Sequence, residues 1–269
     1  MRKQVGQLEI ETIAAERSKF TAPIVLVHGL WCTSTVWHRV MGYLAHRGWD
    51  CHAVNLRGRT AASKHPPLAP TATVGLQDHL DDLNMVVAAC DAPPVLVGHD
   101  VGALLALSRN LGPLRAVVAL APLLPASYRD DPIPGVSSLG ARMAMKLRGQ
   151  LLPPGGRVRQ KYFGRDLPHP LVPEPASLGR QLADTAHSFP LGATVPTLIV
   201  AGDADGVTPL SALSKLAPAI DADLQQVSGG GHAIPWEKGW QDRVTDIHRW
   251  LIRTLGDSLL AFLDEEEAD

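Results

Sequence analysis

The chain is poor in cysteine and in net charge, and it lacks long apolar runs. Its cysteines, Cys32, Cys51 and Cys90, are odd in number and scattered, so they suggest neither a disulfide framework nor a zinc site. The 25 basic and 27 acidic residues nearly cancel, which gives no electrostatic case for a nucleic-acid or membrane partner. No run reaches membrane-spanning length, and Met1 to Glu16 lacks a signal core. We therefore expect a cytoplasmic protein.

What the chain does have is length and a regular alternation of patterns. The 269 residues, 45% of them hydrophobic, are enough to bury a substantial core. Strand-like runs lie at Ile24 to Val27, Cys51 to Leu56, Val95 to Gly98, Ala116 to Leu120, Thr197 to Ala201 and, more weakly, Asp223 to Val227. Helical spacing lies at Val36 to His46, Leu76 to Cys90, Gly102 to Asn110 and Trp240 to Leu255. This alternation predicts an α/β fold, a mostly parallel sheet with helices on both faces.

The alternation stops between Leu123 and Pro196. This stretch is rich in proline and glycine and holds no good strand pattern, yet it is too long for a structureless loop inside a compact domain. We interpret residues 123–196 as a small, mainly helical cap. It would be inserted into a core formed by residues 1–122 and 197–269.

The most informative position is Asp100, in the run Gly98-His99-Asp100-Val101-Gly102. An apolar strand pattern enters this run and a helical pattern leaves it, which is the context of a nucleophile elbow. The paired glycines allow a tight turn that exposes the central side chain. Serine hydrolases carry serine here, and a carboxylate changes the chemistry. Attack of Asp100 on an sp3 carbon would give an ester that water can hydrolyse, whereas attack on an ester would give an anhydride.

Other candidate site residues follow predicted strands, where ligands bind in open α/β sheets. The turn His28-Gly29-Leu30-Trp31 suits an oxyanion hole formed by the N–H groups of Leu30 and Val101. Asp203 and Asp205 both follow the strand at Thr197 to Ala201, and either could orient a histidine or serve only as a turn residue. Three glycines precede His232, which suits a tightly folded loop at a crowded site.

The order nucleophile, acid, histidine is that of the α/β-hydrolases. From about Ile24 to Leu255 the chain resembles the α/β-hydrolase fold superfamily. Its Gly202-x-x-Asp205-x-x-x-Pro209 spacing looks like the acid loop of that family, which favours Asp205 over Asp203. Asn55-Leu56-Arg57 resembles the usual Asp-Leu-Arg turn, with asparagine in place of the aspartate.

The aspartate at the elbow is similar to that of epoxide hydrolases and of haloalkane and fluoroacetate dehalogenases. Haloalkane dehalogenases place tryptophan at the position of Val101 and often asparagine at the position of Leu30. Fluoroacetate dehalogenases place arginines just after the elbow, whereas Arg109 is the first arginine here. Epoxide hydrolases also usually carry tryptophan at the position of Val101, but they demand less at these positions. The resemblance therefore favours an epoxide hydrolase.

Epoxide hydrolases usually protonate the opening oxirane oxygen with two cap tyrosines, and the candidates here are Tyr128 and Tyr162. In the mechanism that the resemblance implies, Asp100 opens the epoxide. His232, held by Asp205, then activates the water that hydrolyses the ester. Residues expected to line the substrate pocket are Trp31, His28, His99 and Trp236, which suggests a small apolar or aromatic substrate. No metal or cofactor is expected.

Three alternatives stay open. Asp100 could act as the base of an unusual ester, lactone or carbon–carbon bond hydrolase or lyase. The protein could be a dehalogenase. It could also be a binding protein without catalysis, because the fold also serves as a scaffold. The sequence leaves the oligomeric state open, with a homodimer as one alternative.

Overall fold

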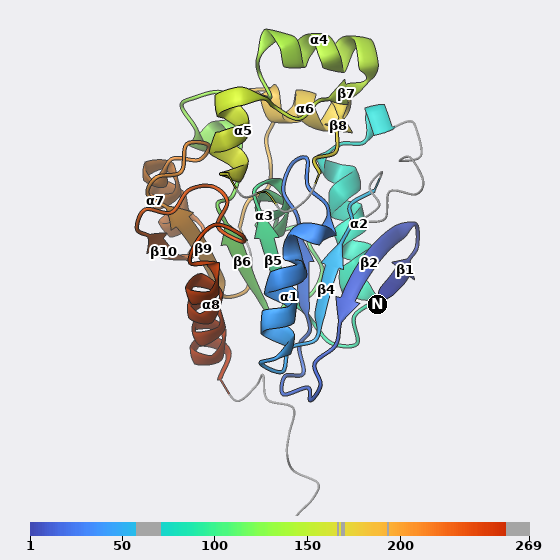
Figure 1. Ribbon diagram of the computed structural model, residues 1–269, viewed down its shortest axis with the longest axis vertical. Helices are drawn as coiled ribbons and strands as arrows, with labels where there is room; N and C mark the ends of the chain where they lie inside the picture. The colour runs from blue at the N-terminus through green and yellow to red at the C-terminus, as the bar shows by residue number, and fades with distance from the viewer. Residues whose placement is uncertain (58–70, 166, 168–169, 193, 257–269) are drawn as a thin grey trace, which may run out of the picture.

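A computed structural model describes residues 1–57, 71–165, 167, 170–192 and 194–256. Its main sheet has eight strands in the order β1-β2-β4-β3-β5-β6-β9-β10 (Figure 1). These are Arg2–Val5, Leu8–Ile13, Cys51–Val54, Ile24–Val27, Val95–His99, Ala116–Leu120, Thr197–Gly202 and Asp223–Val227. The strands β4, β3, β5, β6, β9 and β10 run parallel, and β1 and β2 pair antiparallel at one edge. This confirms the predicted α/β-hydrolase architecture.

Helices cover both faces of this sheet. The helices α1 (His38–Ala45) and α8 (Trp240–Leu255) contact each other on one face, and α2 (Leu76–Ala88) and α3 (Val101–Ala106) contact each other on the opposite face (Figure 1). A further helix, α7 (Leu210–Ala219), packs beside β9 and β10. In the described part of the chain, no helix combines the length and the apolar character that a membrane span requires.

The segment between β6 and β9 lies beyond the carboxyl ends of the parallel strands (Figure 1). We refer to this segment, residues 123–196, as the cap. Its described elements are η3 (Ala126–Tyr128), α4 (Leu139–Arg148), β7 (Gln150–Leu151), α5 (Gly156–Phe163), β8 (Glu174–Pro175) and α6 (Ala176–Ala183). The predicted helical character is therefore present, together with a two-stranded β7–β8 ladder that the sequence did not predict.

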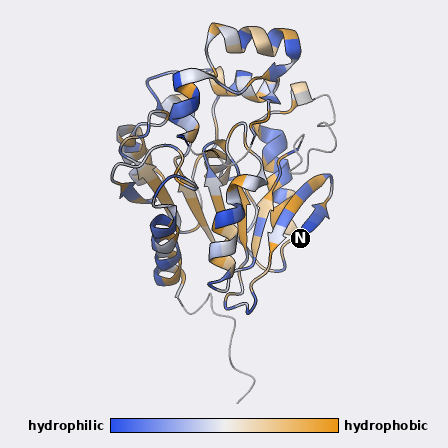
Figure 2. Cartoon of the chain, viewed as in Figure 1, coloured by the Kyte–Doolittle hydropathy of each residue, from blue (hydrophilic) through white to orange (hydrophobic). Residues whose placement is uncertain are grey.

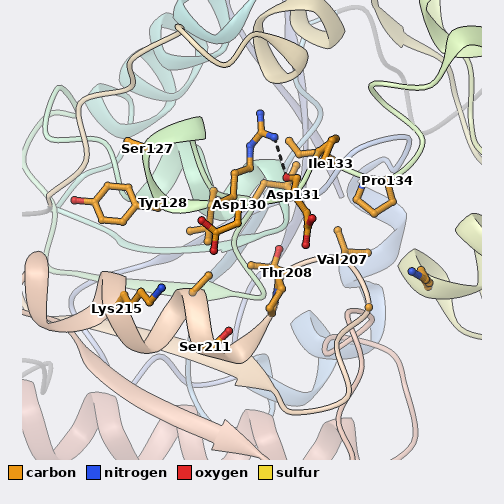
Figure 3. A pocket seen from close by; sticks show the side chains of 18 residues that line it. Ser127, Tyr128, Asp130, Asp131, Ile133, Pro134, Val207, Thr208, Ser211 and Lys215 are labelled. Atoms are coloured by element: carbon orange, nitrogen blue, oxygen red, sulfur yellow. Dashed lines mark hydrogen bonds between the residues drawn. The ribbon is translucent and has the colours of Figure 1, made fainter.

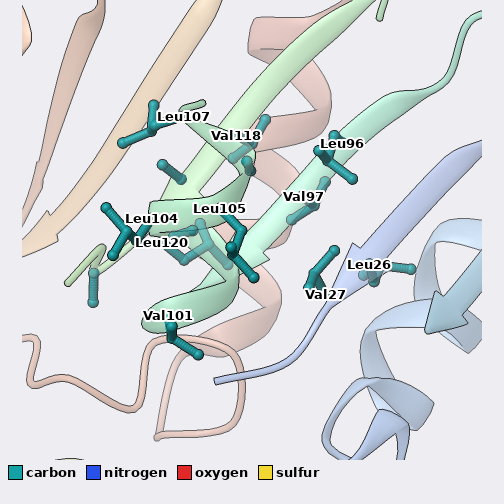
Figure 4. Packing of buried hydrophobic residues seen from close by; sticks show 14 of the residues in the cluster. Leu26, Val27, Leu96, Val97, Val101, Leu104, Leu105, Leu107, Val118 and Leu120 are labelled. Atoms are coloured by element: carbon teal, nitrogen blue, oxygen red, sulfur yellow. The ribbon is translucent and has the colours of Figure 1, made fainter. Parts of the chain in front are cut away.

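The core beneath the cap is apolar and closely packed. Hydropathy colouring shows hydrophobic residues along the central strands and polar residues on the outer faces of the helices (Figure 2). Around the turn between β5 and α3, the buried side chains come from β3, β5, β6 and α3 (Figure 4); they include Leu26, Val27, Leu96, Val97, Val101, Leu104, Leu105, Val118 and Leu120. This packing fixes α3, and with it the residue that precedes α3, against the sheet.

The predicted boundaries differ from the structure in a few places. The helix after Asp100 ends at Ala106 instead of Asn110, and a short 3-10 turn, η1 (Ser34–Trp37), precedes α1. The hairpin β1–β2 went unpredicted because β1 is mostly exposed, so it carries no apolar alternation. The helix α7 was also missed, since Pro218 lies inside it and obscures the helical pattern.

The elbow glycines are expected to be intolerant of any side chain. A Cβ on Gly98 would lie 2.3 Å from the carbonyl oxygen of Gly102, a contact that the backbone cannot relieve without moving the turn. We expect Gly98→Ala to lower the free energy of unfolding by about 2–3 kcal/mol, measured by urea denaturation. Gly42→Ala is the matched control, because Gly42 lies inside α1 with no atom near its added Cβ; it should stabilise by about 0.5–1 kcal/mol. Equal effects would contradict this packing argument.

Candidate active site

Asp100 occupies the turn between β5 and α3 in a backbone conformation that non-glycine residues rarely adopt, with φ of 56° and ψ of −119°. Backbone hydrogen bonds hold it there. Its N–H donates to Leu120 O (3.1 Å), and its carbonyl oxygen accepts from the N–H groups of Leu104 (3.0 Å) and Leu123 (3.1 Å). The surrounding structure therefore maintains the strained turn, as expected for a nucleophile elbow.

The two oxygens of the Asp100 carboxylate have different surroundings. Oδ1 accepts hydrogen bonds from Val101 N–H and from Leu30 N–H, the latter at 3.2 Å. Oδ2 lies 2.9 Å from His232 Nε2. The two backbone donors that the sequence assigned to an oxyanion hole thus converge on one oxygen of Asp100 itself. The other oxygen faces the histidine.

His232 is held on its opposite side by Asp205. The distance from His232 Nδ1 to Asp205 Oδ2 is 2.8 Å, and Asp205 Oδ1 accepts from Val207 N–H (2.7 Å) and Thr208 N–H (3.0 Å). Asp203, the competing acid, instead accepts from Gly229 N–H at 2.7 Å on the exposed side of the loop. The structure therefore brings Asp205, and not Asp203, to the histidine.

The pKa values of His232 and Asp205 depend on each other, because the two side chains are in contact. Burial alone lowers the pKa of His232, but the charge of Asp205 and the hydrogen bonds to Asp100 and Asp205 outweigh it and raise the pKa to about 10. Burial likewise acts to raise the pKa of Asp205, but the charge and hydrogen bond of His232 hold it below its usual range. The contacts with Asp205 and Asp100 therefore favour the protonated form of His232.

His28 and His99 use their ring nitrogens on the backbone around the elbow. His99 Nε2 lies 2.8 Å from His232 O, which can only accept, so this nitrogen carries the hydrogen. Burial lowers the pKa of His99 to about 4, which keeps the ring neutral. His28 Nε2 accepts from Leu56 N–H at 3.4 Å. These contacts hold the loops around Asp100 in place. Contact of the His28 or His99 ring with substrate stays a prediction.

Trp31 and Trp236 are also buried beside Asp100, His232 and Asp205, which we call the triad. Trp31 Nε1–H donates to Leu151 O (3.2 Å), and Trp236 Nε1–H donates to Phe163 O (3.1 Å). Both indoles therefore tie the core to the cap through their N–H groups. Both rings are buried and neither lines the cavity described below, and neither indole N–H is available to hold an anion in this arrangement.

The two candidate tyrosines have different positions. Tyr162, at the end of α5, is fully buried, and its ring packs edge-on against His232 with ring centres 5.2 Å apart. Its hydroxyl donates to Pro134 O at 3.0 Å instead of pointing freely at Asp100. Burial raises the pKa of this phenol well above its usual value, so it stays protonated. Tyr128 is half-buried in η3.

Comparison with known families agrees with this fold. A model of the alpha/beta hydrolase family matches residues 24–246. The chain belongs to this family. A comparison with curated proteins finds no match for this hydrolase.

Similar solved structures support the fold. A monoacylglycerol lipase of Paleococcus ferrophilus is 20% identical, with a TM-score of 0.67, over 92% of this hydrolase and 99% of that chain. A soluble variant of the Saccharomyces cerevisiae monoglyceride lipase is 14% identical, with a TM-score of 0.69, over 94% of each chain. An esterase of Thermogutta terrifontis is 19% identical, with a TM-score of 0.66, over 94% of this hydrolase and 99% of that chain. At these identities the likeness extends to the fold alone.

A cavity of about 600 Å³ lies between the cap and the acid loop of this alpha/beta hydrolase (Figure 3). Tyr128 and Pro134 line it on the cap side, and Val207 and Thr208 line it on the core side. Asp100 and His232 are not among its lining residues. The cavity still adjoins the triad, because Val207 and Thr208 hold Asp205 while Pro134 accepts the Tyr162 hydroxyl.

Glu174 also belongs to the site, although the sequence did not predict it. The buried carboxylate of Glu174, in β8 of the cap, accepts the N–H of Trp31 beside the oxyanion hole. Trp31 itself has a positive φ of 60°, and its carbonyl oxygen accepts from Val172 N–H at 2.9 Å. The cap thus fixes the oxyanion loop. Glu174 stands between two prolines, Pro173 and Pro175, and no motif in the sequence marks it.

Proposed function

We propose that this alpha/beta hydrolase forms a covalent ester between Asp100 and an sp3 carbon of its substrate and then hydrolyses that ester. The proposed substrate is an epoxide of a small apolar or aromatic molecule. One observation carries the proposal: Oδ1 of Asp100 accepts the N–H groups of Leu30 and Val101, while Oδ2 faces His232.

The hydrogen bonds from Leu30 N–H and Val101 N–H to Asp100 Oδ1 support one of two mechanisms over the other. If Asp100 were only a base acting on an ester or lactone, the carbonyl oxygen of the substrate would need the N–H groups of Leu30 and Val101. Those donors already hold Asp100 Oδ1. They are placed to stabilise negative charge on a carbonyl oxygen of Asp100, and such a charge develops when water attacks an ester formed on that residue.

In the first step Asp100 Oδ2 attacks an oxirane carbon and the carbon–oxygen bond of the ring breaks. The leaving oxygen departs on the far side of the carbon from Oδ2, so its proton has to come from the cap and not from His232. Tyr162 is proposed as that donor, and its hydroxyl would exchange Pro134 O for the oxirane oxygen. Displacement of a halide ion is less well supported. The indole N–H groups of Trp31 and Trp236, which could hold the departing ion, already donate to backbone carbonyls.

In the second step His232 activates water. Esterification removes the charge of Asp100, one of the causes that raise the pKa of His232, and the pKa therefore falls once the ester has formed. The imidazolium gives its proton, through solvent, to the Tyr162 phenolate that the first step leaves, and the neutral histidine can then accept a proton from water. Water attacks the ester carbon, and the developing oxyanion stays at Leu30 and Val101. When the bond between the ester carbon and the former Oδ2 breaks, His232 returns that proton to the leaving oxygen, so the diol departs with an original oxygen of Asp100. The new carboxylic acid of Asp100 then gives its proton to His232, which restores the resting site.

The fate of water oxygen tests the proposal directly. In a single turnover with excess enzyme in heavy-oxygen water, we expect the label in the carboxylate of Asp100 and none in the first diol, because water attacks the carboxyl carbon. Mass spectrometry of product and of the peptide containing Asp100 measures both. Repeated turnover in the same water serves as the control, since label should then enter the diol. Label in the first diol would instead show that Asp100 acts as a base.

Removing the Tyr162 hydroxyl tests the proton donor. Tyr162→Phe keeps the ring against His232, so we expect ester formation from an epoxide to slow by about 10²-fold, the usual range for a lost general acid. Stopped-flow or quenched-flow measurement of ester formation gives this rate. Tyr128→Phe is the matched control in the cavity wall and should have a smaller effect. An unchanged rate in Tyr162→Phe would remove Tyr162 from the mechanism.

A further inference from the structure

The outer face of α4 in the cap carries an exposed apolar stripe. The exposed fractions of Leu139, Met143 and Leu147 are 77%, 47% and 73%. Their spacing of four residues places them on one side of the helix. Met145 is 4% exposed, and its sulfur packs beside Gly179 of α6, so α4 turns this other side inward. Nothing in the described structure covers the stripe, and α4 is the element of the cap farthest from the sheet (Figure 1).

Basic residues are concentrated in the segment of the sequence that contains this stripe. Positions 136–165 contain seven Lys and Arg residues and no Asp or Glu, whereas the other 239 residues contain 18 basic and 27 acidic residues. The seven are Arg142, Lys146, Arg148, Arg157, Arg159, Lys161 and Arg165, and all are exposed. None of them takes part in an ion pair found between described residues. The whole cap, residues 123–196, contains nine basic and five acidic residues, so the near-zero net charge of the chain conceals a basic cap with its charge concentrated at positions 136–165.

We propose that α4 docks on an anionic lipid bilayer, with Leu139, Met143 and Leu147 entering the headgroup region. A helix with apolar residues on its outer side and basic residues beside them has the character of interfacial helices. Arg142 and Lys146 flank the stripe and complement acidic headgroups. A second copy of the chain fits less well through the same face, since that would bring two basic caps together. The proposal is independent of the reaction at Asp100.

Co-sedimentation with vesicles tests this docking. The full-length protein is expected to bind vesicles of phosphatidylserine and phosphatidylcholine and to bind pure phosphatidylcholine much more weakly. Arg142→Gln with Lys146→Gln should weaken binding by about 25-fold, since each basic group near an anionic surface strengthens it about five-fold. Leu139→Ser with Leu147→Ser should weaken it by about ten-fold or more.

Matched controls lie on helices away from the cap. Arg39→Gln with Arg253→Gln removes two exposed charges from α1 and α8, and Ile252→Ser removes an exposed apolar side chain from α8. These variants should bind vesicles as the wild type does, and circular dichroism confirms that each variant is folded. Absence of wild-type binding to anionic vesicles, or equal losses in cap and control variants, would overturn the proposal. So would a dimer mass in solution that Leu139→Ser with Leu147→Ser reduces to a monomer, because a second copy would then cover the stripe.

Discussion

The mass of His232→Ala is expected to increase by the mass of the substrate after incubation with it. The added mass should reside on the peptide that contains Asp100. Removing the imidazole leaves the attacking oxygen Oδ2 and the N–H groups of Leu30 and Val101 in place, so the ester can still form. What is lost is the base that activates water for the second step. Steady-state turnover should fall by about 10⁴-fold or more, as for other residues that act within a triad.

The substrate can be found in the same experiment. A panel of epoxides, esters and haloalkanes, each incubated with His232→Ala and followed by intact mass, shows which electrophile alkylates the protein. Asp100→Ala is the control and should take up no mass from any of them. If Asp100→Ala turned over the true substrate at near the wild-type rate, covalent catalysis at this position would be wrong. If a haloalkane but not an epoxide added mass to His232→Ala, the substrate would be a haloalkane.

The sequence made the elbow predictable because its determinants are local. An apolar strand, two close glycines and an apolar helix follow one another within about a dozen residues, and each has a direct physical reason. The structure agrees, since the carbonyl oxygen of Gly102 would lie 2.3 Å from a Cβ on Gly98. The parallel sheet was predictable for the same reason: alternation of strands and helices recurs along the core.

Long-range packing determines what the sequence could not predict. The direction of the Tyr162 hydroxyl depends on where Pro134 lies, and these residues belong to different parts of the cap. The role of Glu174 depends on a contact with Trp31, which is 143 residues away. Charge does not share this limit, because the basic segment at positions 136–165 is contiguous in the sequence and only the total over the whole chain hides it.

The choice between Asp203 and Asp205 is another case that local sequence leaves open, since both acids follow β9 in the same turn. The fold separates them. Asp203 accepts the N–H of Gly229 on the exposed side of the loop, whereas Asp205 is buried against His232 Nδ1 at 2.8 Å. Only Asp205 can therefore orient the ring and stabilise its charge.

Asp205→Asn is accordingly expected to lower turnover by about 10²- to 10⁴-fold, while Asp203→Asn leaves it nearly unchanged. The two substitutions make the same chemical change two positions apart, so each is the control for the other. The amide at position 205 removes the charge that raises the pKa of His232, so that pKa should fall. It can also hold the imidazole in the wrong tautomer. Both effects act on the step that needs His232 as a base.

Ester formation should suffer less than ester hydrolysis, because Asp100 Oδ2 attacks without taking up or releasing a proton. Rapid-quench kinetics of Asp205→Asn should therefore show a burst of ester followed by slow release of product. The pH dependence of the slow phase should shift to lower pH than in the wild type, as the lowered pKa of His232 requires. If Asp203→Asn lost activity while Asp205→Asn kept it, the hydrogen bond between Asp205 and His232 would be structural, and Asp203 would be the acid that supports catalysis.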